Sequence, residues 1–109
     1  MATTYKVLAQ VNPAITTATT FYTVPSSTST VVSTVSVCNI GSWPTTYRIA
    51  VRPSGATLEN KHYIVFDSSI DAQDTQTYTI GITLAATDVV TVYAGSANIV
   101  FNLFGSEIS

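Results

Sequence analysis

Apolar and polar residues alternate with period two along several stretches of this chain. Tyr47, Ile49 and Val51, for example, alternate with Thr46, Arg48, Ala50 and Arg52, so the large apolar side chains and the arginines fall on opposite faces. Successive side chains of a β-strand point to opposite sides, so this alternation is typical of half-buried strands. No run of useful length has a helical period, and we therefore expect an all-β chain.

Residues that favour strands dominate the composition. Thr and Ser make up 31 of the 109 residues, and Val, Ile, Tyr and Phe supply most of the large apolar side chains. Turn-forming Asn, Pro, Gly, Ser and Asp residues separate the apolar stretches. The resulting prediction is eight strands, near residues 5–10, 20–24, 30–39, 45–52, 62–66, 75–82, 89–94 and 97–104.

Eight short strands at spacings of about 8 to 12 residues predict an antiparallel β-sandwich or a jelly roll. A closed barrel is the alternative. A length of 109 residues fits one domain with one modest core, so residues 1–109 are expected to form a single sandwich domain.

Charged side chains are scarce. They account for 9% of the residues against 46% hydrophobic residues, and the net charge is -2. Four basic residues form no stripe that would bind phosphates, so nucleic acid is not an expected partner. A surface this poor in charge differs from that of a free soluble monomer, and we expect other subunits to cover part of it, with a homo-oligomer favoured.

The one cysteine and the N-terminal sequence bear on where the protein is made. Cys38 has no partner for an internal disulfide, which favours synthesis in a cytoplasm. Its apolar neighbours predict a buried, unreactive thiol. The opening residues MATTYKVLAQVNP contain no long apolar stretch, so neither a signal peptide nor a membrane span is expected.

No motif for catalysis, a metal or a cofactor is present. His62 is the only histidine, and it is expected to pack and hydrogen-bond locally at the end of a strand. Asp67, Asp71 and Asp74 are clustered oxygen donors without the spacing of a calcium loop, so a solvated turn is favoured. We therefore expect no catalytic residue, no metal ligand and no cofactor.

Three residues are candidates for contacts with a partner. Arg48 and Arg52 project from one face of a strand, where they fit either an interface or an intramolecular salt bridge. Trp43 lies in a turn before Pro44, where it fits either an exposed interface anchor or a lid over the end of the core.

Three stretches carry a resemblance to a known family: FYTVPSSTSTVVSTVSVCN, TTYRIAVRPSGATLENKHYIVFD and LAATDVVTVYAGSANIVFNLFGSEIS. They resemble small virion structural proteins of tailed phages, cyanophages prominent among them. The resemblance implies a location in the virion after synthesis in the host cytoplasm. It also implies the major capsid protein or other virion proteins as partners, and no active site.

Within that family the chain resembles capsid decoration or cement proteins, which bridge capsomers and stabilise the shell. A neck, tail, baseplate or fibre component is the first alternative. A carbohydrate-binding attachment module is the second, with Trp43 and the tyrosines stacking on sugar rings, although the sequence shows no ordered aromatic platform. An enzyme is the least favoured class.

Overall fold

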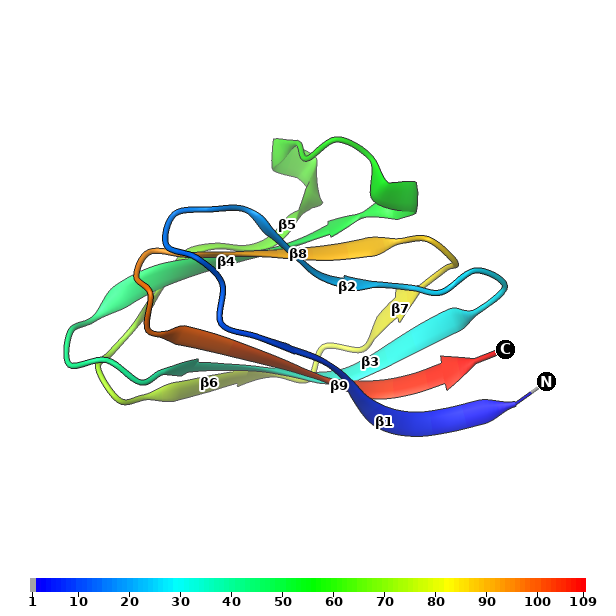
Figure 1. Ribbon diagram of the computed structural model, residues 1–109, viewed down its shortest axis with the longest axis horizontal. Coiled ribbons are helices and arrows are strands. Elements are labelled where there is room, and N and C mark those ends of the chain that lie inside the picture. Colours follow the sequence, from blue (N-terminus) through cyan, green and yellow to red (C-terminus); the bar gives the residue numbers. More distant parts are fainter. Residues whose placement is uncertain (1) are drawn as a thin grey trace.

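A computed structural model describes residues 2–109 and contains two antiparallel β-sheets packed face to face (Figure 1). The first sheet, sheet A, has the strand order β1-β9-β3-β6, with β7 also paired to β3. The second, sheet B, has the order β2-β8-β4-β5. The strands are β1 (Thr3–Val11), β2 (Thr19–Thr23), β3 (Ser29–Asn39), β4 (Thr45–Arg52), β5 (Tyr63–Ile70), β6 (Thr75–Tyr78), β7 (Ile82–Leu84), β8 (Val89–Ala94) and β9 (Ile99–Ile108).

The connectivity is that of a jelly roll. β6 and β7 pair with different parts of β3, so they act as two pieces of one strand. Counting them together gives eight strands, and all but one of the connections cross between the sheets, the exception being the β4–β5 hairpin. The predicted antiparallel sandwich is therefore confirmed. The closed barrel is wrong, because the strands form two separate hydrogen-bonded sheets instead of one closed sheet.

The predicted strands match the observed ones to within two residues, with three larger differences. The segment expected at 75–82 is divided, with Gly81 in the left-handed region at a φ of 67° directly before β7. The strand expected at 62–66 runs on to Ile70, and the last strand runs on to Ile108. Two short 3-10 turns, η1 (Pro53–Gly55) and η2 (Asn60–His62), form the connection that stands above sheet B in Figure 1.

The core lies between the sheets and is built from the inward side of the alternation. Tyr47 of β4 is fully buried and meets Phe101 of β9 edge to face, with ring centroids 6.1 Å apart. Its hydroxyl donates to Oε1 of Gln76 at 2.5 Å and also contacts the hydroxyl of Tyr78. This burial raises the pKa of Tyr47. The hydrogen bonds of the Tyr47 hydroxyl therefore join sheet B to β6, the edge strand of sheet A, within the apolar layer.

The two ends of the sandwich carry different features. The β3–β4, β5–β6 and β8–β9 connections lie at one end of the long axis, and both chain termini lie at the other (Figure 1). That axis extends 45 Å. Among residues 2–109, no helix is both long enough and apolar enough to cross a membrane.

Candidate interaction surfaces

Trp43 lies outside the core in the β3–β4 connection, and its side chain is 81% exposed. Ile40, in the same connection, is 59% exposed. We call these two side chains the apolar tip. The prediction that Trp43 forms a lid over the end of the core is wrong, because so little of the indole is covered. Its role as an anchor for a partner stays a prediction.

The backbone behind the apolar tip is held by Asn39, the last residue of β3, which is fully buried. Its Nδ2 donates to the carbonyl oxygens of Trp43 at 2.8 Å and Asp71 at 3.2 Å. Its Oδ1 accepts from the amide of Gly41 at 2.9 Å. Three bonds from one buried amide thus join the β3–β4 and β5–β6 connections and fix the tip from beneath.

The β8–β9 connection supports the tip from the side. The amide of Ile40 donates to the carbonyl of Asn98 at 2.9 Å. Gly41 lies so close to this connection that a Cβ atom there would come within 2.7 Å of Nδ2 of Asn98. The apolar tip is therefore presented on a tightly braced loop.

The outward side of sheet A carries no charged side chain among the described residues. Lys6 and Glu107 take the inward positions, where they pair at 3.2 Å and Glu107 also accepts from Tyr22 of sheet B. We call the outward positions the uncharged face; they include Tyr5, Val7, Gln10, Val31, Thr34, Ser36, Cys38, Val100, Asn102 and Phe104.

Cys38 belongs to this uncharged face, which corrects the prediction of a buried thiol. It is only half-buried, because Val37 takes the inward position and the alternation turns Cys38 outward. The apolar neighbours that suggested burial lie in the same strand but point to the other side.

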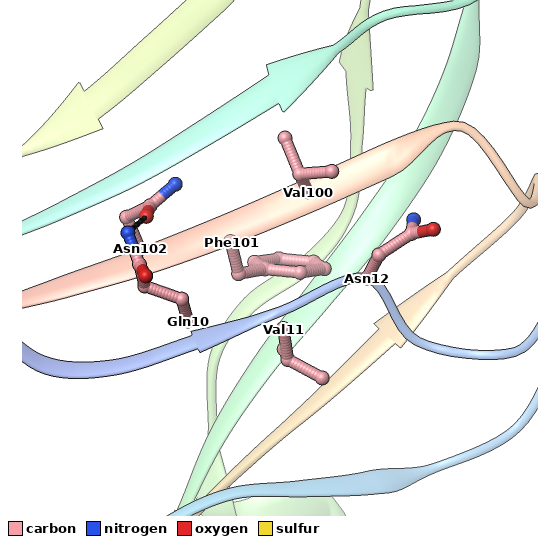
Figure 2. A pocket seen from close by; sticks show the side chains of 6 residues that line it. All are labelled: Gln10, Val11, Asn12, Val100, Phe101 and Asn102. Atoms are coloured by element: carbon pink, nitrogen blue, oxygen red, sulfur yellow. Dashed lines mark hydrogen bonds between the residues drawn. The ribbon is translucent and has the colours of Figure 1, made fainter.

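A shallow hollow of about 250 Å³ lies on the outer side of sheet A where β1 leaves β9 (Figure 2). The polar side chains that line this hollow are hydrogen-bonded to other groups of the chain. Nε2 of Gln10 donates to Oδ1 of Asn102 at 2.7 Å, and Nδ2 of Asn12 donates to the carbonyl of Ile99 at 2.7 Å. Val11, Val100 and Phe101 complete the lining. None of these six residues has an ionisable side chain, so the hollow contains no acid or base group.

Arg48 lies on the outward face of sheet B. Its Nε donates to Oδ1 of Asp67 at 2.7 Å and its Nη2 to Oδ2 at 3.3 Å. This contact holds the pKa of Asp67 below its usual range and raises the pKa of Arg48. Its Cζ also lies 4.2 Å from the ring centroid of Phe66 and 4.3 Å from that of Tyr93. Of the two roles predicted for Arg48, the intramolecular salt bridge is therefore present.

Arg52 lies on the same face as Arg48, as predicted, and is also engaged within the chain. Its Nε donates to Oγ1 of Thr91 at 3.0 Å, and its Nη1 donates to the carbonyls of Ala56 at 2.9 Å and Gly55 at 3.3 Å. It ties the β4–β5 connection to sheet B rather than to an acidic residue. Neither arginine is brought next to Trp43, which lies in the connection before β4.

His62 has the local role expected for it. It is buried at the end of η2, and its Nδ1 accepts from the amide of Glu59 at 3.0 Å. Asp67 is bound to Arg48 instead of joining Asp71 and Asp74 in a common site. Among residues 2–109, no cluster of three or more His, Cys, Asp or Glu side chains is arranged to hold a metal ion.

Comparison of the chain with protein-family models and with curated proteins finds no match. One group of residues is not evident from the sequence, namely the aromatic side chains around Arg48. The sequence places Tyr63 and Phe66 in a strand but does not show which way they point, and the polar Asp67 after them predicts a turn. The signal that marks the longer strand is Ile70, whose apolar side chain is fully buried.

Proposed function

We propose that this chain is a non-enzymatic structural subunit of a virus particle, a capsid decoration protein that docks on the shell through its apolar tip. The observation that carries the proposal is the exposure of Trp43 and Ile40 on a loop braced by buried Asn39. A preorganised aromatic anchor is the kind of residue that dominates binding energy at protein interfaces.

The uncharged face supplies the second contact that a decoration protein needs. Hydroxyl, amide and apolar groups cover it, and no like charges oppose one another when copies approach. In the proposed role it packs against neighbouring copies or virion proteins, with the hollow between β1 and β9 as a place for a protruding side chain. Many such contacts stabilise the shell because they exist only in the assembled state.

The virion setting rests on the resemblance of three sequence stretches to small structural proteins of tailed phages. The same sandwich would serve in a neck, tail, baseplate or fibre, where an axial ring needs few copies. Copy number separates these locations.

The test is the number of copies relative to the major capsid protein in purified particles, measured by quantitative mass spectrometry. A ratio of about one third or more supports a decoration protein, and about a dozen copies or fewer per particle supports an axial component. Absence of the chain from particles would overturn the proposal of a virion protein.

A variant tests the docking surface itself. Trp43→Ala should reduce incorporation about 30-fold, because a central Trp contributes about 2 kcal/mol or more at an interface. Ile64→Ala is the matched control, since Ile64 is also an exposed apolar residue but lies on β5. Equal incorporation of both variants would exclude the apolar tip as the anchor.

A further inference from the structure

Three aromatic side chains gather on the outward face of sheet B, away from the core. The rings of Tyr63 and Phe66 meet edge to face with centroids 4.9 Å apart. Arg48 lies between the rings of Phe66 and Tyr93. Phe66 remains 56% exposed. Core packing does not require these rings, because they point away from the layer between the sheets.

A β-bulge in β5 creates this arrangement. Tyr47 pairs with Ser68 and Ile49 pairs with Val65, so Phe66 and Asp67 together lie opposite the single residue Arg48. Asp67 adopts a left-handed backbone with a φ of 50°. Bulges re-aim side chains and are common beside functional sites, as are residues with strained backbones. Here the bulge brings a ring and a carboxylate to the same arginine.

The arginine that contacts the aromatic rings is paired with an acid, so the pair adds no net charge beside them. Asp67 already neutralises Arg48 through two contacts. An anionic ligand would have to compete with Asp67, and a cationic ligand would find Arg48 already against the aromatic rings. A neutral ligand meets neither obstacle.

The same surface is hollowed beside the aromatic rings. Asn60, Tyr63 and Phe66 line a hollow of about 380 Å³. Asn60 comes from η2 in the connection that stands above sheet B in Figure 1, whereas the two aromatic residues belong to β5. This volume lies within the range of small-molecule sites, which combine apolar walls with a few polar groups.

We propose that this hollow binds a neutral saccharide. The apolar C–H face of a pyranose ring packs on the aromatic walls, and its hydroxyls bond to the side-chain amide of Asn60 and the hydroxyl of Tyr63. The site is separate from the apolar tip and the uncharged face, so it does not depend on the proposed docking to a shell.

The test is a titration of the isotope-labelled protein with maltose, cellobiose, lactose and mannobiose, followed through its backbone amide NMR signals. We expect saturable shifts at Asn60, Tyr63 and Phe66 with at least one neutral disaccharide below about 50 mM, and weaker shifts with galacturonic acid. No shift with any of the neutral probes, or shifts spread evenly over the chain, would overturn the site.

Paired variants make the test specific. Phe66→Ala should weaken binding about tenfold or more, while Ile64→Ala should leave it unchanged because Ile64 does not line the hollow. Both residues are exposed, so both variants should fold, and thermal unfolding verifies this. Equal affinity of the two variants would overturn the proposal, whatever the copy number in particles proves to be.

Discussion

At the scale of single residues, buried polar side chains determine how the loops of this sandwich are held. Asn39 is the clearest case, because its amide makes three bonds and no part of it reaches solvent. Replacing it with Ala leaves two carbonyls and one amide without their partner. Each buried unsatisfied group costs about 1 to 3 kcal/mol, although water entering the space would offset part of this.

We therefore expect Asn39→Ala to lower the free energy of unfolding by about 2 to 4 kcal/mol in urea denaturation. The indole of Trp43 should also become more mobile, which fluorescence anisotropy would detect. Asn60→Ala removes an exposed amide and serves as the control. A loss no larger than that of the control would show that the bonds of Asn39 contribute little net stability.

Glu107 provides a second residue-scale prediction, which concerns pH. The hydrogen bond from Tyr22, followed by the contact with Lys6, holds the pKa of Glu107 below its ordinary value of 4.5. A lowered folded-state pKa adds stability that is complete above the unfolded-state pKa and is lost as the pH falls through the folded-state pKa. The free energy of unfolding should thus decline as the pH drops below about 4.5.

The variant Glu107→Gln isolates this contribution. It should be less stable than the parent protein at pH 7, and the two stability curves should converge as the pH falls below 4. Asp67 also has a lowered pKa, but its carboxylate lies at the solvent-exposed surface, so its share is small. Asp67→Asn is therefore the matched control. Parallel curves for Glu107→Gln and the parent would contradict the prediction.

The hydrogen bond between Tyr22 and Glu107 also affects the pKa of Tyr22, which it raises instead of lowers. Burial, with the bond to Glu107, raises the pKa of Tyr22 from 10.0 to about 12. A raised pKa adds stability that is present below pH 10 and is lost as the pH rises toward 12. In thermal unfolding, the parent protein should lose stability across this alkaline range, and Tyr22→Phe should flatten the curve there. An unchanged alkaline slope would contradict it.

At the scale of elements, the central pairing of β3 with β9 depends on one glycine. A Cβ atom on Gly105 would lie 2.1 Å from the carbonyl oxygen of Val31 and 3.0 Å from Cα of Val32. Both strands beside β9 have an irregular register at this level, at Val7/Ala9 in β1 and at Val32/Thr34 in β3. Only a residue without a side chain lets these backbones approach.

Gly105→Ala should consequently force β3 and β9 apart and cost about 3 kcal/mol or more, measured by thermal unfolding. Gly81→Ala is a suitable comparison, because no atom lies within 4 Å of its added Cβ and only its left-handed φ is strained, at about 1 to 2 kcal/mol. If both variants lost equal stability, backbone crowding at Gly105 would not be the cause.

Elements are also where the sequence predicted most of the fold. The alternation of apolar and polar residues located the strands because the apolar positions are those that face the core, as in β4 and β9. It misplaced the end of β5 because the run Asp67, Ser68, Ser69 looks like a turn. Strand pairing with β4 and the burial of Ile70 override that local preference. The partner of Arg48 could not be predicted either, since the bulge that presents Asp67 depends on this pairing.

At the scale of the whole molecule, the fold separates charged from uncharged surface. Arg48, Arg52 and Asp67 lie on or beside the outward face of sheet B, whereas the described outward positions of sheet A are uncharged. The low charge content showed that part of the surface would lack charge, but not which part. That needed the topology, because β1, β3 and β9 become neighbours only after the chain has crossed between the sheets.

This separation leads to a prediction about self-association. If copies pack through the uncharged face, their association should depend little on salt, because no exposed charges are screened. Sedimentation velocity between about 50 and 500 mM NaCl should give nearly the same dimerisation constant. Ser36→Lys, which places a charge at the middle of the face, should weaken association, whereas Thr46→Lys, outside that face, should not. Association that falls steeply with salt would instead implicate the charged surface of sheet B.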